Sequence, residues 1–379
     1  MISLKKEIKD VLKVFSNLSN STISNDNKDI VIVLVENKTL TLISENVDCL
    51  LLYKTQIESD DNFMVNWDIK QLCSLVEKLN CDIKIDENGV YTNTGKYTFS
   101  SKEIGKTRES IKELVEAHSI RPVNKISFVD YEKINVAKSF LGKEVEKNKD
   151  YTCIVLHKNK LLSNNGTTIY RDDLSNLKDG EIANITEQLF VKDSIIKGLG
   201  DKSNKFNICL YDNESSFWSL ENETLGLNIY IYHKYNQEIP DLDADGFRQL
   251  YDHRDSFLFN AKEFCKKLDV IMIGASSNPN NKINIRFNGN KLYIENKENN
   301  NNSFDSVDCK YSECFENEFF PVDGRFVLQI VSLFEGMVKA FMNLDMPIVR
   351  FVDMEKVQEE DKRLILYARL KKLQSKEQK

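Results

Sequence analysis

The sequence lacks several features that would assign the protein to a common class. It contains no run of about 18 apolar residues, so no helix is expected to span a membrane. The first residues, Met1 to Lys6, include no apolar stretch like that of a signal peptide, so we expect a cytoplasmic protein. The strings GxGxxG, GxxxxGKS/T, HExxH and GxSxG are absent, which argues against the enzymes that use them.

Metal-ligating residues are few or scattered. The chain has 4 isolated histidines and 8 cysteines without a CxxC pair, which argues against a zinc site or a disulfide framework. Its carboxylates do not cluster around a histidine or lysine suited to acid–base chemistry. We therefore expect no cofactor and no catalytic residue. An enzyme remains an alternative that turnover of nucleotide or nucleic acid by the pure protein would favour.

One pattern occurs three times along the 379 residues. In each copy a short apolar strand precedes a lysine-bearing amphipathic helix, and strands, a second helix and more strands follow. The expected helix pairs are 4–15 with 67–79, 131–141 with 187–196, and 261–271 with 325–337. Successive copies start roughly 130 residues apart, which is typical of whole domains. The sequence predicts an α+β protein of three similar domains, 1–122, 123–254 and 255–379, each with two helices packed on antiparallel sheets.

Basic residues recur on these helices, although the chain has a net charge of −7. On a single helix such a face usually means only a solvated surface. The recurrence of basic faces on several helices indicates that, if these helices lie side by side, they form one basic surface that lines a concave side of the protein. This lining would bind the phosphates of double-stranded DNA independently of base sequence. The expected DNA-binding residues are Lys5, Lys6, Lys9, Lys13, Lys70, Lys78, Lys133, Lys138, Lys192, Lys197, Lys262 and Lys266, and Arg325 on the sixth helix.

Five segments resemble, in order and spacing, segments of the bacterial β sliding clamps, the processivity rings of replicative DNA polymerases. They are 93–100 (NTGKYTFS), 162–169 (LSNNGTTI), 239–242 (IPDL), 322–328 (VDGRFVL) and 366–370 (LYARL). Thr167 and Thr168 replace a His-Arg pair of the family, and Tyr367 and Ala368 replace Pro-Met. The resemblance is thus to a divergent clamp, which would suit a phage or a plasmid-like replicon as well as a host chromosome.

The resemblance implies a head-to-tail homodimer that closes a ring of clamp domains around duplex DNA. Such a ring needs no catalysis and tethers a replicative polymerase after a clamp loader places it, in the cytoplasm of a bacterial or phage-infected cell. It also implies an apolar groove for partner peptides. By position, that groove would use Ile154, Gly166, Thr167, Thr168, Ile169, Pro240, Asp323, Phe326, Leu364, Leu366, Tyr367 and Leu370. The polar tail 371–379 extends beyond the family's usual end and could lie over this groove.

Two further alternatives remain open. One is a ring-forming structural or assembly protein without a replicative role. The other is a calcium-binding module, because Asp241, Asp243, Asp245 and Asp252 occupy positions 1, 3, 5 and 12 of a calcium loop, with glycine at position 6. Against calcium, Arg248 stands where an apolar residue normally pins such a loop.

Overall fold

The structure is a computed structural model of the chain. It describes residues 1–5, 7–19, 29–46, 48–127, 131–142, 153–157, 160–173, 189–199, 206–212, 215–232, 241–275, 281–298, 301–354 and 363–368. These residues form helices and antiparallel sheets, so the predicted α+β class is confirmed. The chain divides into two compact units. The first comprises residues 1–136, 153–159 and 174–236, and the second comprises residues 137–152, 160–173 and 237–379. The three-domain boundaries at 122 and 254 stay a prediction.

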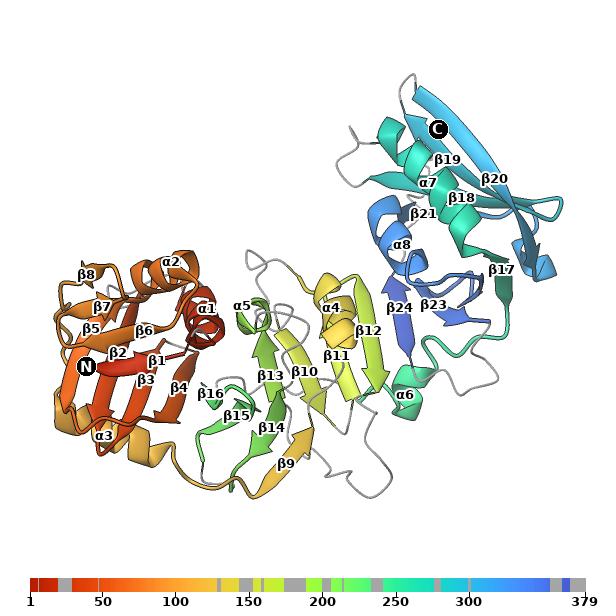
Figure 1. The fold of residues 1–379 in the computed structure, drawn as a ribbon. Helices are drawn as coiled ribbons and strands as arrows, with labels where there is room; N and C mark the ends of the chain where they lie inside the picture. Colours follow the sequence, from red (N-terminus) through yellow and green to blue (C-terminus); the bar gives the residue numbers. More distant parts are fainter. Residues whose placement is uncertain are drawn as a thin grey trace. The chain divides into compact units, whose positions relative to one another are not determined.

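The first unit is built on one large antiparallel sheet (Figure 1). In spatial order its strands are β5 (Phe63–Asp68), β2 (Ile30–Glu36), β3 (Thr39–Glu45), β4 (Cys49–Gln56), β16 (Leu227–Tyr232), β15 (Phe217–Asn222), β14 (Asn207–Leu210) and β9 (Asn124–Ser127). Strand β4 pairs directly with β16, with Leu51 opposite Ile229. The sheet therefore joins strands from the first and second sequence copies without a break.

A smaller sheet and several helices complete the first unit. The small sheet has the order β1 (Ile2–Leu4), β6 (Ile83–Asp86), β7 (Gly89–Tyr91) and β8 (Lys96–Thr98), while β10 (Cys153–His157) pairs with β13 (Leu189–Lys192). The helices are α1 (Ile8–Ser19), α2 (Ile69–Leu79), α3 (Arg108–Ala117) and α5 (Asp193–Gly198). Both faces of β2 are buried, and its face with Ile30, Ile32 and Leu34 packs with Ile111 of α3. The connector between the first two copies thus contributes to the core.

The second unit is also organised around antiparallel strands. Their order is β11 (Lys160–Asn164), β12 (Thr168–Asp173), β24 (Leu364–Ala368), β23 (Ile348–Asp353), β22 (Met337–Met342), β17 (Ser256–Asn260), β20 (Asn301–Tyr311), β19 (Lys291–Glu298), β18 (Lys282–Asn288) and β21 (Phe319–Asp323). Its helices are α6 (Asp245–Arg248), α7 (Ala261–Ala275) and α8 (Gly324–Val331), with a short 3-10 turn at Glu313–Phe315. Helix α4 (Tyr131–Ser139) begins in the first unit and ends in the second.

Four predicted helix boundaries are wrong, each for a local reason. Trp67 and Asp68 belong to β5, and α2 starts only at Ile69, because Asp68 is its N-cap. Residues 189–192 form strand β13, because a short buried apolar run has no periodicity that separates strand from helix. The last predicted helix ends at Val331, and Met337 begins β22. Leu4 belongs to β1, so Lys5 lies between that strand and α1. In these places strand pairing overrides the pattern of apolar residues.

Candidate nucleic-acid and partner-peptide sites

The two units each bring together helices from different sequence copies. In the first unit α1 packs against both α2 and α5 (Figure 1). Helix α5 approaches closely at Gly198, where an added Cβ would lie 2.3 Å from Cδ2 of Leu18 on α1. In the second unit α7 packs against α8, and Gln329 of α8 donates a hydrogen bond to the carbonyl of Ser139 at the end of α4. Helices that the sequence spaces far apart therefore form neighbouring pairs in both units.

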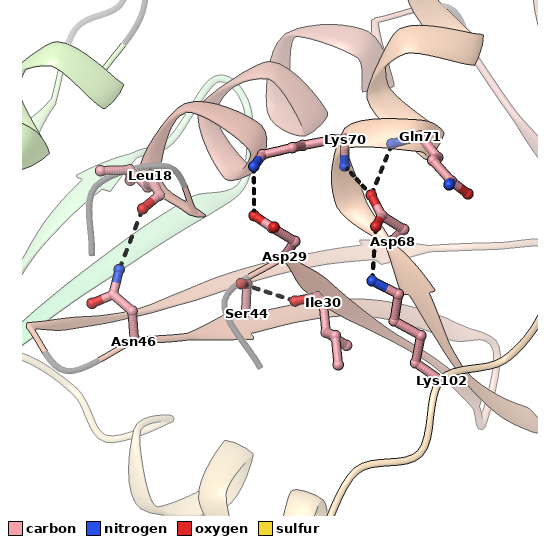
Figure 2. Close-up of polar contacts among 9 residues, drawn as sticks. All are labelled: Leu18, Asp29, Ile30, Ser44, Asn46, Asp68, Lys70, Gln71 and Lys102. Atoms are coloured by element: carbon pink, nitrogen blue, oxygen red, sulfur yellow. Dashed lines mark hydrogen bonds and ion pairs between the residues drawn. The ribbon is translucent and has the colours of Figure 1, made fainter. Parts of the chain in front are cut away.

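Polar contacts fix the ends of α1 and α2 over the main sheet (Figure 2). Asp68 caps α2, because its carboxylate accepts hydrogen bonds from the backbone N–H groups of Lys70 and Gln71 at 3.0 Å. Partial burial by itself raises the pKa of Asp68, but hydrogen bonds from Lys102 and from the cap backbone lower it overall. Asn46 donates from Nδ2 to the carbonyl of Leu18, near the end of α1. These contacts hold the helix pair in a fixed orientation on the sheet.

The predicted DNA-binding residues of the first unit fall into two groups. Lys5, Lys13, Lys78 and Lys197 are exposed, and Lys133 is partly exposed. Three more, Lys9, Lys70 and Lys192, contact polar side chains of the unit, and Lys6 lies outside the described residues. Lys9 donates to Oδ1 of Asn80 at 3.1 Å, Lys70 pairs with Asp29 at 3.0 Å, and Lys192 pairs with Asp48 at 2.8 Å. A lysine that pairs with a carboxylate offers less charge to a phosphate, so exposed Lys5, Lys13 and Lys78 are stronger candidates than Lys70 and Lys192.

The second unit presents fewer of the predicted cations. Lys262 and Lys266 are exposed on α7, and Lys138 is partly exposed at the end of α4. Arg325 is exposed on α8 but lies 3.4 Å from Oδ2 of Asp323, the residue that caps that helix. Among the predicted cations of this unit, the exposed lysines therefore lie on α7.

An apolar cluster forms where β12 and β24 pair in the second unit, and we call it the β24 cluster. Its buried members are Leu242, Tyr251, Leu364 and Leu366, and its partly buried members are Leu162, Ile169, Phe247 and Ile348. Ile169 lies opposite Leu366 across the β12–β24 pair. Alternation along β24 places Leu364 and Leu366 on one face of the sheet. The structure thus brings together three predicted groove residues that are nearly 200 positions apart.

Five members of the β24 cluster were not predicted as groove residues. Leu162 alternates with buried residues along β11, which is a recognisable strand signal. Leu242, Phe247 and Tyr251 come from the acidic segment 241–255, which the sequence presented mainly as a calcium alternative. Ile348 starts β23. These residues come together because β24 pairs with both β12 and β23. The sequence pattern within each strand does not predict which strands pair.

Ion pairs hold the segment 241–255 against the strands of the β24 cluster. Asp243 pairs with Lys160 and, at 2.7 Å, with Arg171, while Arg350 lies 3.7 Å from Asp252. Burial alone raises the pKa of Asp243, but the hydrogen bonds from Lys160 and Arg171 lower it overall. Two carboxylates of the calcium alternative therefore bind cationic side chains. Among the described residues, no group of three or more His, Cys, Asp or Glu side chains is arranged to hold a metal.

Other predicted groove residues have structural contacts. Tyr367 is buried, and its hydroxyl accepts a hydrogen bond from the backbone N–H of Asp323 at 2.7 Å. Burial raises the pKa of this phenol, so it stays protonated. Asp323 in turn accepts from the N–H of Arg325 at 3.0 Å and caps α8. These two residues tie β24 to the start of α8.

The β11–β12 turn adjoins the end of β24. Gly166 is exposed with a φ of 81°, and the side chain of Asn165 accepts from the N–H groups of Thr167 and Thr168. The carbonyl of Thr167 accepts from the N–H of Ala368 at 2.8 Å, whereas the side chain of Thr168 is buried. This turn therefore borders the β24 cluster mainly through its backbone.

The remaining predicted groove positions are not gathered there by the described contacts. Phe326 is partly exposed on α8, and Ile154 is buried on β10 in the first unit. Pro240 and Leu370 lie outside the described residues. The groove prediction therefore rests on Ile169, Leu364 and Leu366.

Comparison with known proteins gives no match by sequence. No known family's sequence profile fits the chain, and no curated protein matches it. In the part of the chain that the structure describes, no helix is both long and apolar enough to cross a bilayer.

Solved structures match the chain along nearly its whole length. The DNA polymerase III β subunit of Thermotoga maritima matches with a TM-score of 0.76 at 11% identity, covering 98% of this chain and 99% of that one. The β sliding clamp of C. crescentus gives 0.74 at 10% identity, covering 98% and 99%. The DNA polymerase sliding clamp of Pseudomonas aeruginosa gives 0.73 at 12% identity, covering 98% and 100%. The chain therefore has the fold of the bacterial β sliding clamps, and the predicted resemblance is confirmed at that level.

Proposed function

We propose that the protein is a DNA sliding clamp, a ring that encircles duplex DNA and tethers a replicative polymerase. The observation that carries this proposal is the clamp fold over 98% of the chain. A fold by itself does not establish a function. The recurrence of exposed lysines on the helices supplies the independent chemical argument.

The DNA-binding surface would be the lysine-bearing helices. Lys5, Lys13, Lys78, Lys262 and Lys266 are exposed at or near α1, α2 and α7. Contacts of such residues with phosphates are independent of base sequence and weaken steeply with salt, because binding releases counterions. A chain with a net charge of −7 would repel DNA elsewhere on its surface. The proposed contact is thus weak and mobile, as sliding requires.

Ring closure would join two copies head to tail. In the first unit β8 ends its sheet and carries Tyr97, which is 37% exposed. In the second unit β20 pairs with β19 from Asn301 to Asp308 but with β17 only over its last residues. Near this strand, Val270 and Ile273 on α7 and Phe304 on β20 are 63%, 75% and 73% exposed. Within the described residues, 301–308 of β20 have a strand partner on one side only and lie beside exposed apolar side chains. This arrangement suits a heterologous interface with the β8 edge of another copy.

Partner proteins, including the polymerase and a clamp loader, would bind through the β24 cluster. Its four partly buried members, Leu162, Ile169, Phe247 and Ile348, form the accessible apolar surface. A short peptide with leucine or phenylalanine anchors would fill such a surface, while the polar residues of the β11–β12 turn supply hydrogen bonds. Because Thr167 and Thr168 replace the family's His-Arg pair, we expect this chain to prefer a different peptide motif from that of the family.

Measurement of mass and shape tests the proposed assembly. Light scattering at micromolar concentration should give about twice the 43.9 kDa chain mass, because each copy offers one complementary interface to the other. Class averages from electron microscopy should show a closed ring with an opening that admits a DNA duplex. A monomer under these conditions, or a particle without an opening, would contradict the proposal.

A further inference from the structure

We propose that the C-terminal segment 369–379 binds the β24 cluster of its own chain and competes there with partner peptides. The inference rests on the proposed function of that cluster as a partner site, and it adds a regulator carried by the same chain. Residues 369–379 lie outside the described residues.

The chain leaves the described structure at the cluster itself. Strand β24 contributes Leu364 and Leu366 to the buried part of the cluster. Its last residue, Ala368, pairs with Ile348, one of the partly buried members. The eleven residues that follow can span on the order of 35 Å when extended. The segment therefore starts at the edge of the apolar surface and is long enough to fold back across it.

The segment 369–379 combines apolar and basic residues that are complementary to the surface of the β24 cluster. It carries Leu370 and Leu373, with Arg369, Lys371, Lys372, Lys376 and Lys379 as its basic residues and Glu377 as its single acidic residue. Residues 241–255, which form one wall of the cluster, contain five aspartates and two arginines. Asp243 and Asp252 already pair with cationic side chains of the neighbouring strands, whereas Asp245 and Asp255 are exposed and would attract basic residues. Apolar anchors flanked by basic residues thus match an apolar surface beside an acidic wall.

The covalent connection makes a weak contact effective. A segment tethered by a short flexible link has an effective concentration on the order of millimolar at its site. An intrinsic affinity of a few hundred micromolar is then enough to occupy the site most of the time. A partner peptide would bind several-fold more weakly to the full chain than to a chain without the segment.

Peptide binding in trans tests this inference directly. A fluorescent synthetic peptide of residues 369–379 is titrated, by fluorescence anisotropy, into the full chain and into a chain truncated after Leu370. We expect saturable binding to the truncated chain and several-fold weaker binding to the full chain, whose own segment competes. Leu373→Asp in the full chain should restore most of the binding. Raising the salt concentration should weaken it, because the basic residues contribute.

Matched variants locate the binding site. Phe247→Ala in the truncated chain should weaken binding at least fivefold, because Phe247 is a partly buried member of the cluster. Phe319→Ala, the same change on β21 outside the cluster, should leave binding unchanged. Equal binding to the full and truncated chains, or binding that Phe247→Ala does not alter, would overturn the inference. Retention of both chains on circular DNA is measured in parallel, so loss of clamp function is seen separately from loss of competition.

Discussion

Val270→Asp combined with Ile273→Asp is expected to convert the protein from a dimer into a monomer. Both side chains are exposed on α7, and the proposed ring would bury them against the first unit of the other copy. Burying two aliphatic side chains contributes about 3–6 kcal/mol, and each 1.4 kcal/mol is a tenfold change in affinity. Aspartate removes this contribution and places an unpaired charge in the interface. We expect the dimer dissociation constant to rise at least about a hundredfold.

The dimer prediction has a matched control. Ile120→Asp combined with Val123→Asp introduces the same two charges at residues that are 44% and 74% exposed in the first unit, where Val123 hydrogen-bonds to β14, a strand of a different sheet from β8. Sedimentation of both variants over nanomolar to micromolar concentrations gives the two dissociation constants, and circular dichroism checks that both remain folded. If the α7 variant stays dimeric, or if the control dissociates as much as the α7 variant does, the prediction that α7 lies in the interface is wrong.

Lys5→Glu combined with Lys13→Glu is expected to shorten retention on circular DNA at least about tenfold at moderate salt. Both lysines are exposed, whereas Lys9 between them donates to Asn80 of α2. Each lost phosphate contact lowers the salt dependence of binding by about one unit of slope, and glutamate adds repulsion. The measurement is the half-life of labelled protein on a nicked circle across a salt series.

The control for the lysine pair changes the same charge elsewhere. Lys38 and Lys291 lie at the ends of hairpin turns and are 64% and 48% exposed, so Lys38→Glu with Lys291→Glu alters net charge equally. We expect the control to retain nearly the unchanged half-life and salt slope. If both pairs shorten retention to the same extent, the effect comes from net charge and α1 does not contact DNA.

Local sequence patterns predicted much of the fold. The amphipathic character predicted for the first helix is confirmed on α1, because Leu12 and Phe15 are only 2% and 0% exposed. Hairpin turns of the structure also coincide with Gly and Asn residues that allow positive φ, as at Gly289. These features depend on residues that are close in sequence, so they can be predicted without knowledge of the tertiary structure.

The long-range pairings could not be predicted in the same way. Pairing of β4 with β16 and of β12 with β24 joins strands about 180 to 200 residues apart, and the alternation within each strand does not identify its partner. The β24 cluster depends on the second of these pairings. That is why Leu364, Leu366 and Ile169 were expected through resemblance alone, while Phe247 and Tyr251 were missed. Contacts of Lys70 with Asp29 and Lys192 with Asp48 were hidden for the same reason.

Release from circular DNA on cutting tests the central claim most directly. Labelled protein is placed on a nicked circle, by a loader or by brief opening of the dimer, and free protein is removed by gel filtration. The account predicts that protein stays with the intact circle and leaves within minutes once a restriction enzyme makes the DNA linear, because a ring slides off free ends. Equal retention on circular and linear DNA would contradict encirclement and indicate ordinary surface binding.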